Sequence, residues 1–300
     1  MKASYKNFMT GLIDYAGFFP PADLDIETVV GNYAGYLRGE NGWMLGRCII
    51  PATQLNRVVL HPGFRCSVIV SPDVPQEEID QLSSFKGHVE MVETRLPENA
   101  TSPAGCMDQL LHLHSRLLKA GLQDVQLFVE AESVVPIALQ IATFSPSQIG
   151  GKVIKNVGYK LRCGGLTKQA FPSPEKVADA ISICCEHEIP VKFTAGMHHS
   201  LRNHSPELMV MQHGFINIFG ASLLYWNGNL SRNEITECLR DEAAHHFHFT
   251  EENFSWREKI ISASEISRLR QSKVISFGSC SFIEPVEGLN SLGLNGNTGA

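Results

Sequence analysis

Short apolar runs alternate with longer amphipathic stretches through the first 220 or so residues. The segment from Asp23 to Arg38 has Ile26, Val29 and Val30 at helical spacing, and similar stretches follow most of the apolar runs. Strand-like runs occur at 12–16, 44–50, 66–70, 88–94, 125–129, 157–162, 191–194 and 215–219. Eight strands, each followed by a helical stretch, predict parallel pairing with right-handed crossovers.

Eight such units in about 220 residues favour a closed (β/α)8 TIM-like barrel of α/β class. The alternative is an open doubly wound parallel sheet. That fold usually carries a glycine-rich GxGxxG turn after its first strand, and no such turn follows a strand here.

The chain continues beyond the eighth predicted strand. Helices are predicted over 231–244 and 255–271, with a capping box from Ser262 to Glu265, and a helix over 206–212 precedes them. A short strand is predicted over 274–277. We therefore expect one domain over 1–289 with a helical C-terminal extension from about residue 230, and a disordered tail over 290–300 that is rich in Gly, Asn and Ser.

Composition narrows the class of protein. Of 300 residues 43% are apolar and 19% charged, and the net charge is −6, which is typical of a well-cored enzyme. The mild acidity and the lack of a basic run argue against nucleic-acid binding, and no apolar stretch reaches the roughly 20 residues that span a membrane. The polar N-terminus and eight scattered cysteines without a CxxC pair predict a cytoplasmic protein, which could form a homo-oligomer.

Two strand-like segments carry basic residues in their interiors. Because strand side chains alternate between faces, Lys160 and Arg162 share one face, and Lys192 and Thr194 share one face of the second segment. Cys163 falls on the opposite face and is read as a packing residue. A buried lysine is costly unless it is paired, so the basic strands predict a site for a small anion.

Barrel active sites lie at the carboxyl ends of the strands, where several polar residues of this chain converge. The candidate catalytic residues are Lys192, Lys160, Glu130 and Asp14. The candidate substrate-binding residues are Arg162, Gly164, Gly165, Thr194, His198, His199, Asn217 and Ser279. Asp14 and Glu130 could alternatively only balance the lysines in a buried ion-pair network. Ser279 enters this set because the segment 277–282 is expected either to return to the barrel and close the site or to form an edge strand.

Four motifs together resemble a family of uncharacterised proteins. They are LIDYAGFFPPA at 12–22, KLRCGG at 160–165, KFTAGMHH at 192–199 and FGSCSF at 277–282. The resemblance spans nearly the whole chain and implies no established activity. Lys192-Phe-Thr-Ala-Gly196 is also similar to the strand of class I aldolase barrels that carries a Schiff-base lysine, and this similarity raises imine chemistry as a possibility.

The favoured function is an enzyme acting on a small carboxylated or phosphorylated metabolite. Lysine-imine chemistry of the aldolase, lyase or isomerase kind would use Lys192 first and Lys160 second, and would need no cofactor. Arg162 would hold the anion, with the Gly164 and Gly165 amides assisting, and Glu130 or Asp14 would move protons. One alternative is a lyase or hydrolase dependent on a divalent metal ion held by His198 or His199 with Glu130 and Asp14; the other is a non-catalytic anion-binding protein.

Overall fold

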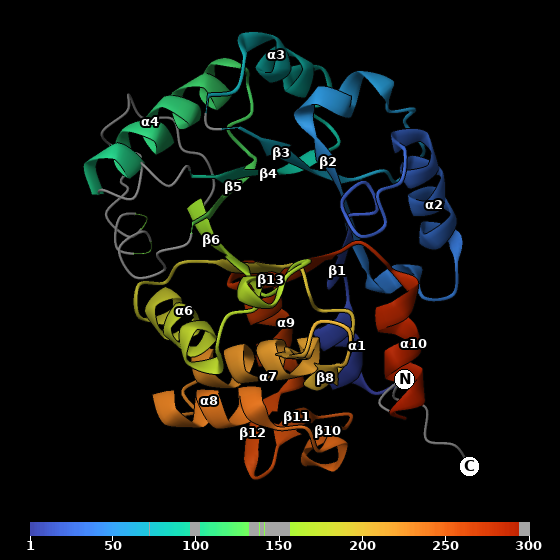
Figure 1. Cartoon of the computed structure of the whole chain (residues 1–300), viewed down its shortest axis with the longest axis vertical. Helices are drawn as coiled ribbons and strands as arrows, with labels where there is room; N and C mark the ends of the chain where they lie inside the picture. Colours follow the sequence, from blue (N-terminus) through green and yellow to red (C-terminus); the bar gives the residue numbers. More distant parts are fainter. Residues whose placement is uncertain (72, 97–102, 132–137, 139–140, 142–156, 294–300) are drawn as a thin grey trace.

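Eight parallel strands close into a barrel in the computed structural model, which describes residues 1–71, 73–96, 103–131, 138, 141 and 157–293 (Figure 1). Their order around the barrel is β1-β13-β7-β6-β5-β4-β3-β2. The strands are β1 (Ile13–Tyr15), β2 (Leu45–Pro51), β3 (Cys66–Val70), β4 (Val89–Arg95), β5 (Gln126–Glu130), β6 (Val157–Arg162), β7 (Val191–Thr194) and β13 (Val274–Ser279). The predicted (β/α)8 fold class is confirmed.

Helices surround the barrel on its outer side (Figure 1). They include α1 (Ala3–Met9), α2 (Ile26–Arg38), α3 (Gln76–Ser84), α4 (Pro103–Lys119) and α6 (Pro174–Glu186). Asp25 and Ser173 accept hydrogen bonds from backbone amides at the starts of α2 and α6, as helix N-caps do. The sequence also predicts a helix over 134–143, and most of this segment lies outside the described residues. No helix in the described part of the chain is long and apolar enough to cross a membrane.

The run 215–219 is not a strand but the start of helix α7 (Phe215–Trp226), so the prediction there was wrong. The Phe215 ring of this helix stacks on the Phe277 ring of the barrel wall, with 5.3 Å between ring centroids. Gly220, also on this helix, lies against Phe254 of an outer sheet. A helix packed on both faces has no polar stripe, so its apolar run reads as a buried strand. The eighth barrel strand is instead β13.

The chain after residue 230 is not solely helical. Helix α8 (Arg232–Arg240) leads into an antiparallel sheet of β10 (Phe247–Phe249), β11 (Asn253–Trp256) and β12 (Lys259–Ser262). The helix predicted over 255–271 forms only in its second half, as α9 (Ala263–Ser272), which begins at the predicted Ser262 cap. Residues 203–212, partly predicted as a helix, form the hairpin of β8 (Asn203–Ser205) and β9 (Val210–Gln212). Helix α10 (Ile283–Ser291) includes the first residues of the predicted tail, and 294–300 lie outside the described residues.

The barrel interior is apolar near the amino ends of the strands. Met91, Phe128 and Ile275 form a small cluster there. Gly158 of β6 has no side chain because a Cβ atom would overlap the Phe128 ring. Glu93 and Glu130 follow Met91 and Phe128 by two residues on β4 and β5, so they lie on the carboxyl side of this cluster along their strands.

Candidate active site in the barrel interior

Five charged side chains from five different strands meet inside the barrel. Asp14 comes from β1, Glu93 from β4, Glu130 from β5, Lys160 from β6 and Lys192 from β7, and all five are buried. Side chains on a strand point alternately to its two faces, and each of these five residues stands at a position that faces the barrel interior. The structure thus brings together all four predicted catalytic residues and adds Glu93.

Glu93 is the common partner of the two lysines. Its Oε1 lies 2.7 Å from Lys192 Nζ and its Oε2 lies 2.7 Å from Lys160 Nζ. The Ser67 hydroxyl donates a further hydrogen bond to Oε1 at 2.5 Å. Burial opposes ionisation, but the two ammonium groups outweigh it and hold the pKa of Glu93 far below its usual range. Glu93 is therefore a carboxylate that two cations share.

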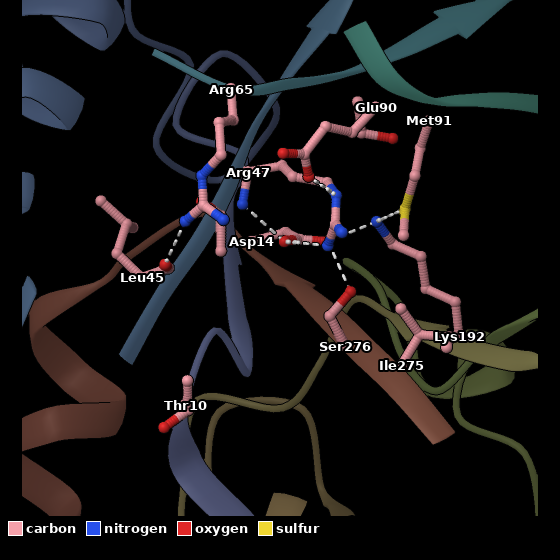
Figure 2. A network of polar contacts seen from close by, with 12 residues as sticks. Thr10, Asp14, Leu45, Arg47, Arg65, Glu90, Met91, Lys192, Ile275 and Ser276 are labelled. Carbon is pink, nitrogen blue, oxygen red and sulfur yellow. Dashed lines mark hydrogen bonds and ion pairs between the residues drawn. The ribbon is translucent and has the colours of Figure 1, made fainter. Parts of the chain in front are cut away.

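Asp14 fixes the second lysine (Figure 2). Its Oδ2 pairs with Lys192 Nζ and accepts a hydrogen bond from Ser276 Oγ at 2.6 Å, and its Oδ1 accepts from the Arg47 backbone amide at 2.7 Å. Gly46 makes room for this carboxylate, because a Cβ atom there would overlap Oδ1. The Arg47 side chain turns toward Glu90, 2.9 Å away. Both carboxylate oxygens of Asp14 therefore have partners, Lys192 on one side and residues of strands β2 and β13 on the other.

Glu130 links the interior to the rim of the barrel. Its Oε2 lies 3.1 Å from Lys160 Nζ, and its Oε1 accepts a hydrogen bond from Arg162 Nε at 2.9 Å. Burial opposes its ionisation, but Lys160 and Arg162 hold the pKa of Glu130 below its usual value. Burial likewise opposes the charge on Lys160, yet Glu93 and Glu130 raise its pKa. The resting site therefore contains ionised Glu130 and protonated Lys160.

The basic residues lie at different depths. The Arg162 side chain is 43% exposed, that of Lys160 is 6% exposed and that of Lys192 is fully buried. Arg162 stands beside Thr194 in the register of β6 and β7, and Thr194 stands beside Gly278 of β13. Arg162 is therefore the most exposed of the three and Lys192 the least, although Lys160 and Lys192 stand side by side in the register of β6 and β7.

The glycines of the two basic motifs bring their loops into contact. A Cβ atom on Gly164 would lie 2.7 Å from Gly196 Cα, and one on Gly165 would lie 2.8 Å from the Ala170 side chain. Ala195 and Gly196 both have positive φ, 62° and 70°, which turns the chain sharply at the end of β7. Close packing explains these glycines, and anion binding by the Gly164 and Gly165 amides stays a prediction.

The remaining predicted binding residues divide into two groups. Ser279 is buried at the end of β13 beside Tyr15, so the C-terminal segment does return to the barrel. Asn217 lies in α7, where its amide donates to the carbonyls of Cys238 and Asp241 at 2.8 and 2.7 Å. It also accepts from the Arg202 amide, so Asn217 is a structural residue, and its expected position in a strand was wrong.

His198 and His199 lie in the loop after β7. His198 pairs with Glu284 of α10, 2.7 Å away, while His199 is exposed and has its pKa lowered by partial burial and by the charge of His198. In the described residues, no three His, Cys, Asp or Glu side chains are grouped so that they could hold a metal ion. Asp14 and Glu130, the other ligands of the metal alternative, pair with Lys192 and Lys160, and that alternative stays a prediction.

Sequence reasoning missed Glu93, Ser67 and Ser276. The strand over 88–94 was predicted, and Glu93 alternates with the inward Met91, so the signal was present. This signal was ambiguous because Glu90, on the same strand, points to the opposite face from Glu93 and pairs with Arg47. Two acidic residues of opposite phase do not reveal which one faces inward.

The fold and the site together define a (β/α)8 barrel protein with a buried lysine–carboxylate network in the interior of the barrel. Comparison of the chain with models of protein families, with curated proteins and with solved structures gave no match. The geometry of the site is therefore the basis for a functional proposal.

Proposed function

We propose that this protein is an enzyme that forms an imine between a barrel lysine and the carbonyl group of a small anionic metabolite, in lyase or aldolase-like chemistry. The observation that carries the proposal is the sharing of Glu93 by Lys160 and Lys192. Structural barrel interiors are filled mainly by branched apolar side chains. Buried ion networks contribute little net stability compared with apolar packing, so their presence at this end favours a chemical role.

Lys160 is the better nucleophile of the two, although the sequence motif favoured Lys192. Lys160 lies nearer the rim and on the same strand as the anion-binding Arg162. An amine attacks a carbonyl only after losing its proton, and Glu130, 3.1 Å away, is the carboxylate on the rim side of Lys160 that can accept it. The pKa of Lys160 is raised and that of Glu130 is lowered in the resting site, so the transfer requires a substrate anion that draws the Arg162 charge away from Glu130. Lys192 then remains as the cation beside Glu93, so the buried charge stays compensated.

The imine step balances within the site. Lys160 Nζ gives one proton to Glu130 and bonds to the carbonyl carbon. The carbonyl oxygen takes up a second proton from that nitrogen and then the proton held by Glu130, and it leaves as water, so the imine nitrogen keeps one proton. The protonated imine then withdraws electrons from the adjacent carbon–carbon bond, which is what aldol cleavage requires. Arg162 contacts Glu130 through Nε. Its two terminal nitrogens could donate to a carboxylate or a phosphate, and for this reason we propose substrates that carry one of these groups.

The test is borohydride reduction in the presence of a panel of phosphorylated aldehydes and 2-ketoacids, followed by peptide mapping of the wild-type protein. We expect an adduct on Lys160, its loss in Lys160→Met, and its retention in Lys168→Met, which changes an exposed lysine. An adduct on Lys192 instead would reverse the assignment. Compounds that stabilise the protein thermally without giving any adduct or turnover would favour the alternative of a non-catalytic anion-binding protein.

A further inference from the structure

A second group of reactive side chains lies at the same end of the barrel, outside the lysine network. Cys280 directly follows β13, His198 lies in the loop after β7, and Glu284 is in the first turn of α10. His198 Nε2 is 3.8 Å from Cys280 Sγ, and His198 Nδ1 is 2.7 Å from Glu284 Oε2. The thiol, the imidazole and the carboxylate thus stand in line, each within reach of the next.

We propose that Cys280, His198 and Glu284 form a nucleophilic triad that transfers or hydrolyses acyl groups of small esters or thioesters. Each residue has the position its role needs. Glu284 accepts the Nδ1 proton of His198, which leaves Nε2 with the lone pair that faces the thiol. The assignment does not depend on the imine chemistry proposed for Lys160.

The histidine is held in place from both sides. The turn at Ala195 and Gly196 precedes it, and Met197 beside it is buried. The carbonyls of His199 and Ser200 accept hydrogen bonds from the first amides of α7, at 3.1 and 2.9 Å. A loop fixed at both ends keeps the imidazole aimed at Cys280, which is the preorganisation that a general base requires.

The cysteine segment is equally fixed. The Ser279 carbonyl accepts a hydrogen bond from the Ala16 amide at 2.7 Å, and Ser281 Oγ accepts from the Glu284 amide at 3.2 Å. Phe282 packs on Tyr36 of α2, with 5.1 Å between ring centroids. Cys280 and Glu284 are therefore held four residues apart on one rigid turn, with His198 between their side chains.

The protonation state of the thiol calls for general-base activation. Burial raises the pKa of the Cys280 thiol, although the backbone N–H of Ala22 acts in the opposite direction. The sulfur therefore needs a base to take its proton, and His198 Nε2 is the neighbouring base, 3.8 Å away. In the first step the S–H proton moves to His198 Nε2 as sulfur bonds to the acyl carbon, and the leaving alcohol or thiol takes that proton when its bond breaks. Water then attacks the thioester, gives a proton to His198, and the carbon–sulfur bond breaks to return the thiol.

The triad and the lysine network lie at different heights along the neighbouring strands β7 and β13. Thr194 pairs with Gly278, so Lys192 lies two residues before this level and Cys280 two residues after it. Four residues correspond to roughly 13 Å along the strand direction. The triad therefore lies at the outer rim and the lysines deep inside, and each can be tested without the other.

The first test is site-resolved alkylation with iodoacetamide at one pH. Cys185 is the internal control, since it is also only partly buried but lies near Glu186, Glu188 and Lys273. We expect Cys280 to react at least tenfold faster than Cys185, and His198→Gln to slow Cys280 alone. Equal rates for both cysteines, or a Cys280 rate unaffected by His198→Gln, would overturn the triad.

The second test is turnover of p-nitrophenyl acetate with trapping of the acyl enzyme. We expect an acetyl group on Cys280, loss of turnover in Cys280→Ala, and a loss of about 100-fold or more in His198→Gln, as removal of a general base costs. Cys185→Ala and His204→Gln, a surface histidine on β8, should retain the wild-type rate. Acetylation only at lysines, or turnover that survives in Cys280→Ala, would refute the proposal. Lys160→Met should keep this activity, and Cys280→Ala should keep borohydride trapping.

Discussion

The change Glu93→Gln removes one negative charge from the centre of the site while keeping the shape of the side chain. Lys160 and Lys192 each lose a carboxylate oxygen 2.7 Å away and keep one other partner, Glu130 and Asp14 respectively. Removing one partner from a buried ion pair costs about 3–5 kcal/mol. Because each lysine keeps a second carboxylate, we expect a loss near 3 kcal/mol in the free energy of unfolding.

Urea denaturation measures this loss, with Glu90→Gln as the matched control. Glu90 lies on the same strand, but its side chain is 37% exposed and its ion-pair partner is Arg47. Such a partly exposed pair contributes about 0–1 kcal/mol. A loss in Glu93→Gln no larger than that in Glu90→Gln would refute the inference that the interior charges stabilise one another.

The pH dependence gives an independent check on the same variant. The pKa of Glu93 is lower in the folded chain than its ordinary value of 4.5, so its contribution is present above about pH 4.5 and is lost as the pH falls below that. The difference in unfolding free energy between wild type and Glu93→Gln should therefore shrink as the pH is lowered from 5 toward 3. A difference that stays constant over this range would show that Glu93 acts through packing and not through charge.

Two further changes test the fold around the site. Gly46→Ala places a methyl group against Asp14 Oδ1 and should destabilise the protein by about 1–3 kcal/mol, measured by thermal unfolding. The control Gly31→Ala, in open space on α2, should leave the protein equally or more stable. Equal effects of the two changes would contradict the proposed packing. Truncation after Gln271 removes β13 and should prevent a cooperative unfolding transition, whereas truncation after Leu289 should preserve one, and a folded Gln271 truncation would contradict the role of β13 in closing the barrel.

The sequence was informative where strands alternate or are short and bounded. The bounds predicted for Cys66–Val70, Val157–Arg162 and Val191–Thr194 agree with the structure to the residue. It failed where tertiary packing decides. Helix α7 is covered by the barrel on one side and by the outer sheet on the other, which erases the helical pattern that an exposed face would leave. Because 215–219 was predicted as the eighth barrel strand, the segment that forms β13 was predicted as an additional strand outside the eight of the barrel.

The same limit applies to the two candidate sites. Lysines inside strands are visible in the sequence because buried charge is rare, and this led directly to Lys160 and Lys192. The sequence gives a weaker signal for the triad. Cys280 and Glu284 are four residues apart, but His198 is 82 residues away from the cysteine. Only the neighbouring positions of β7 and β13 in the barrel bring them together, and the false eighth strand separated these two in the predicted order.

The pairing of the buried charges is compatible with the imine chemistry that we propose. Each lysine has two carboxylates, and Glu93 has two lysines, so no single proton movement leaves a group wholly uncompensated. In the reaction that we propose, Lys160 would give its proton to Glu130 while Lys192 still neutralises Glu93, and Arg162 would be left beside the neutral acid with its charge free for a substrate anion. Binding of an anion at the rim and release of the amine below it would then be coupled through Glu130, because each step would favour the other.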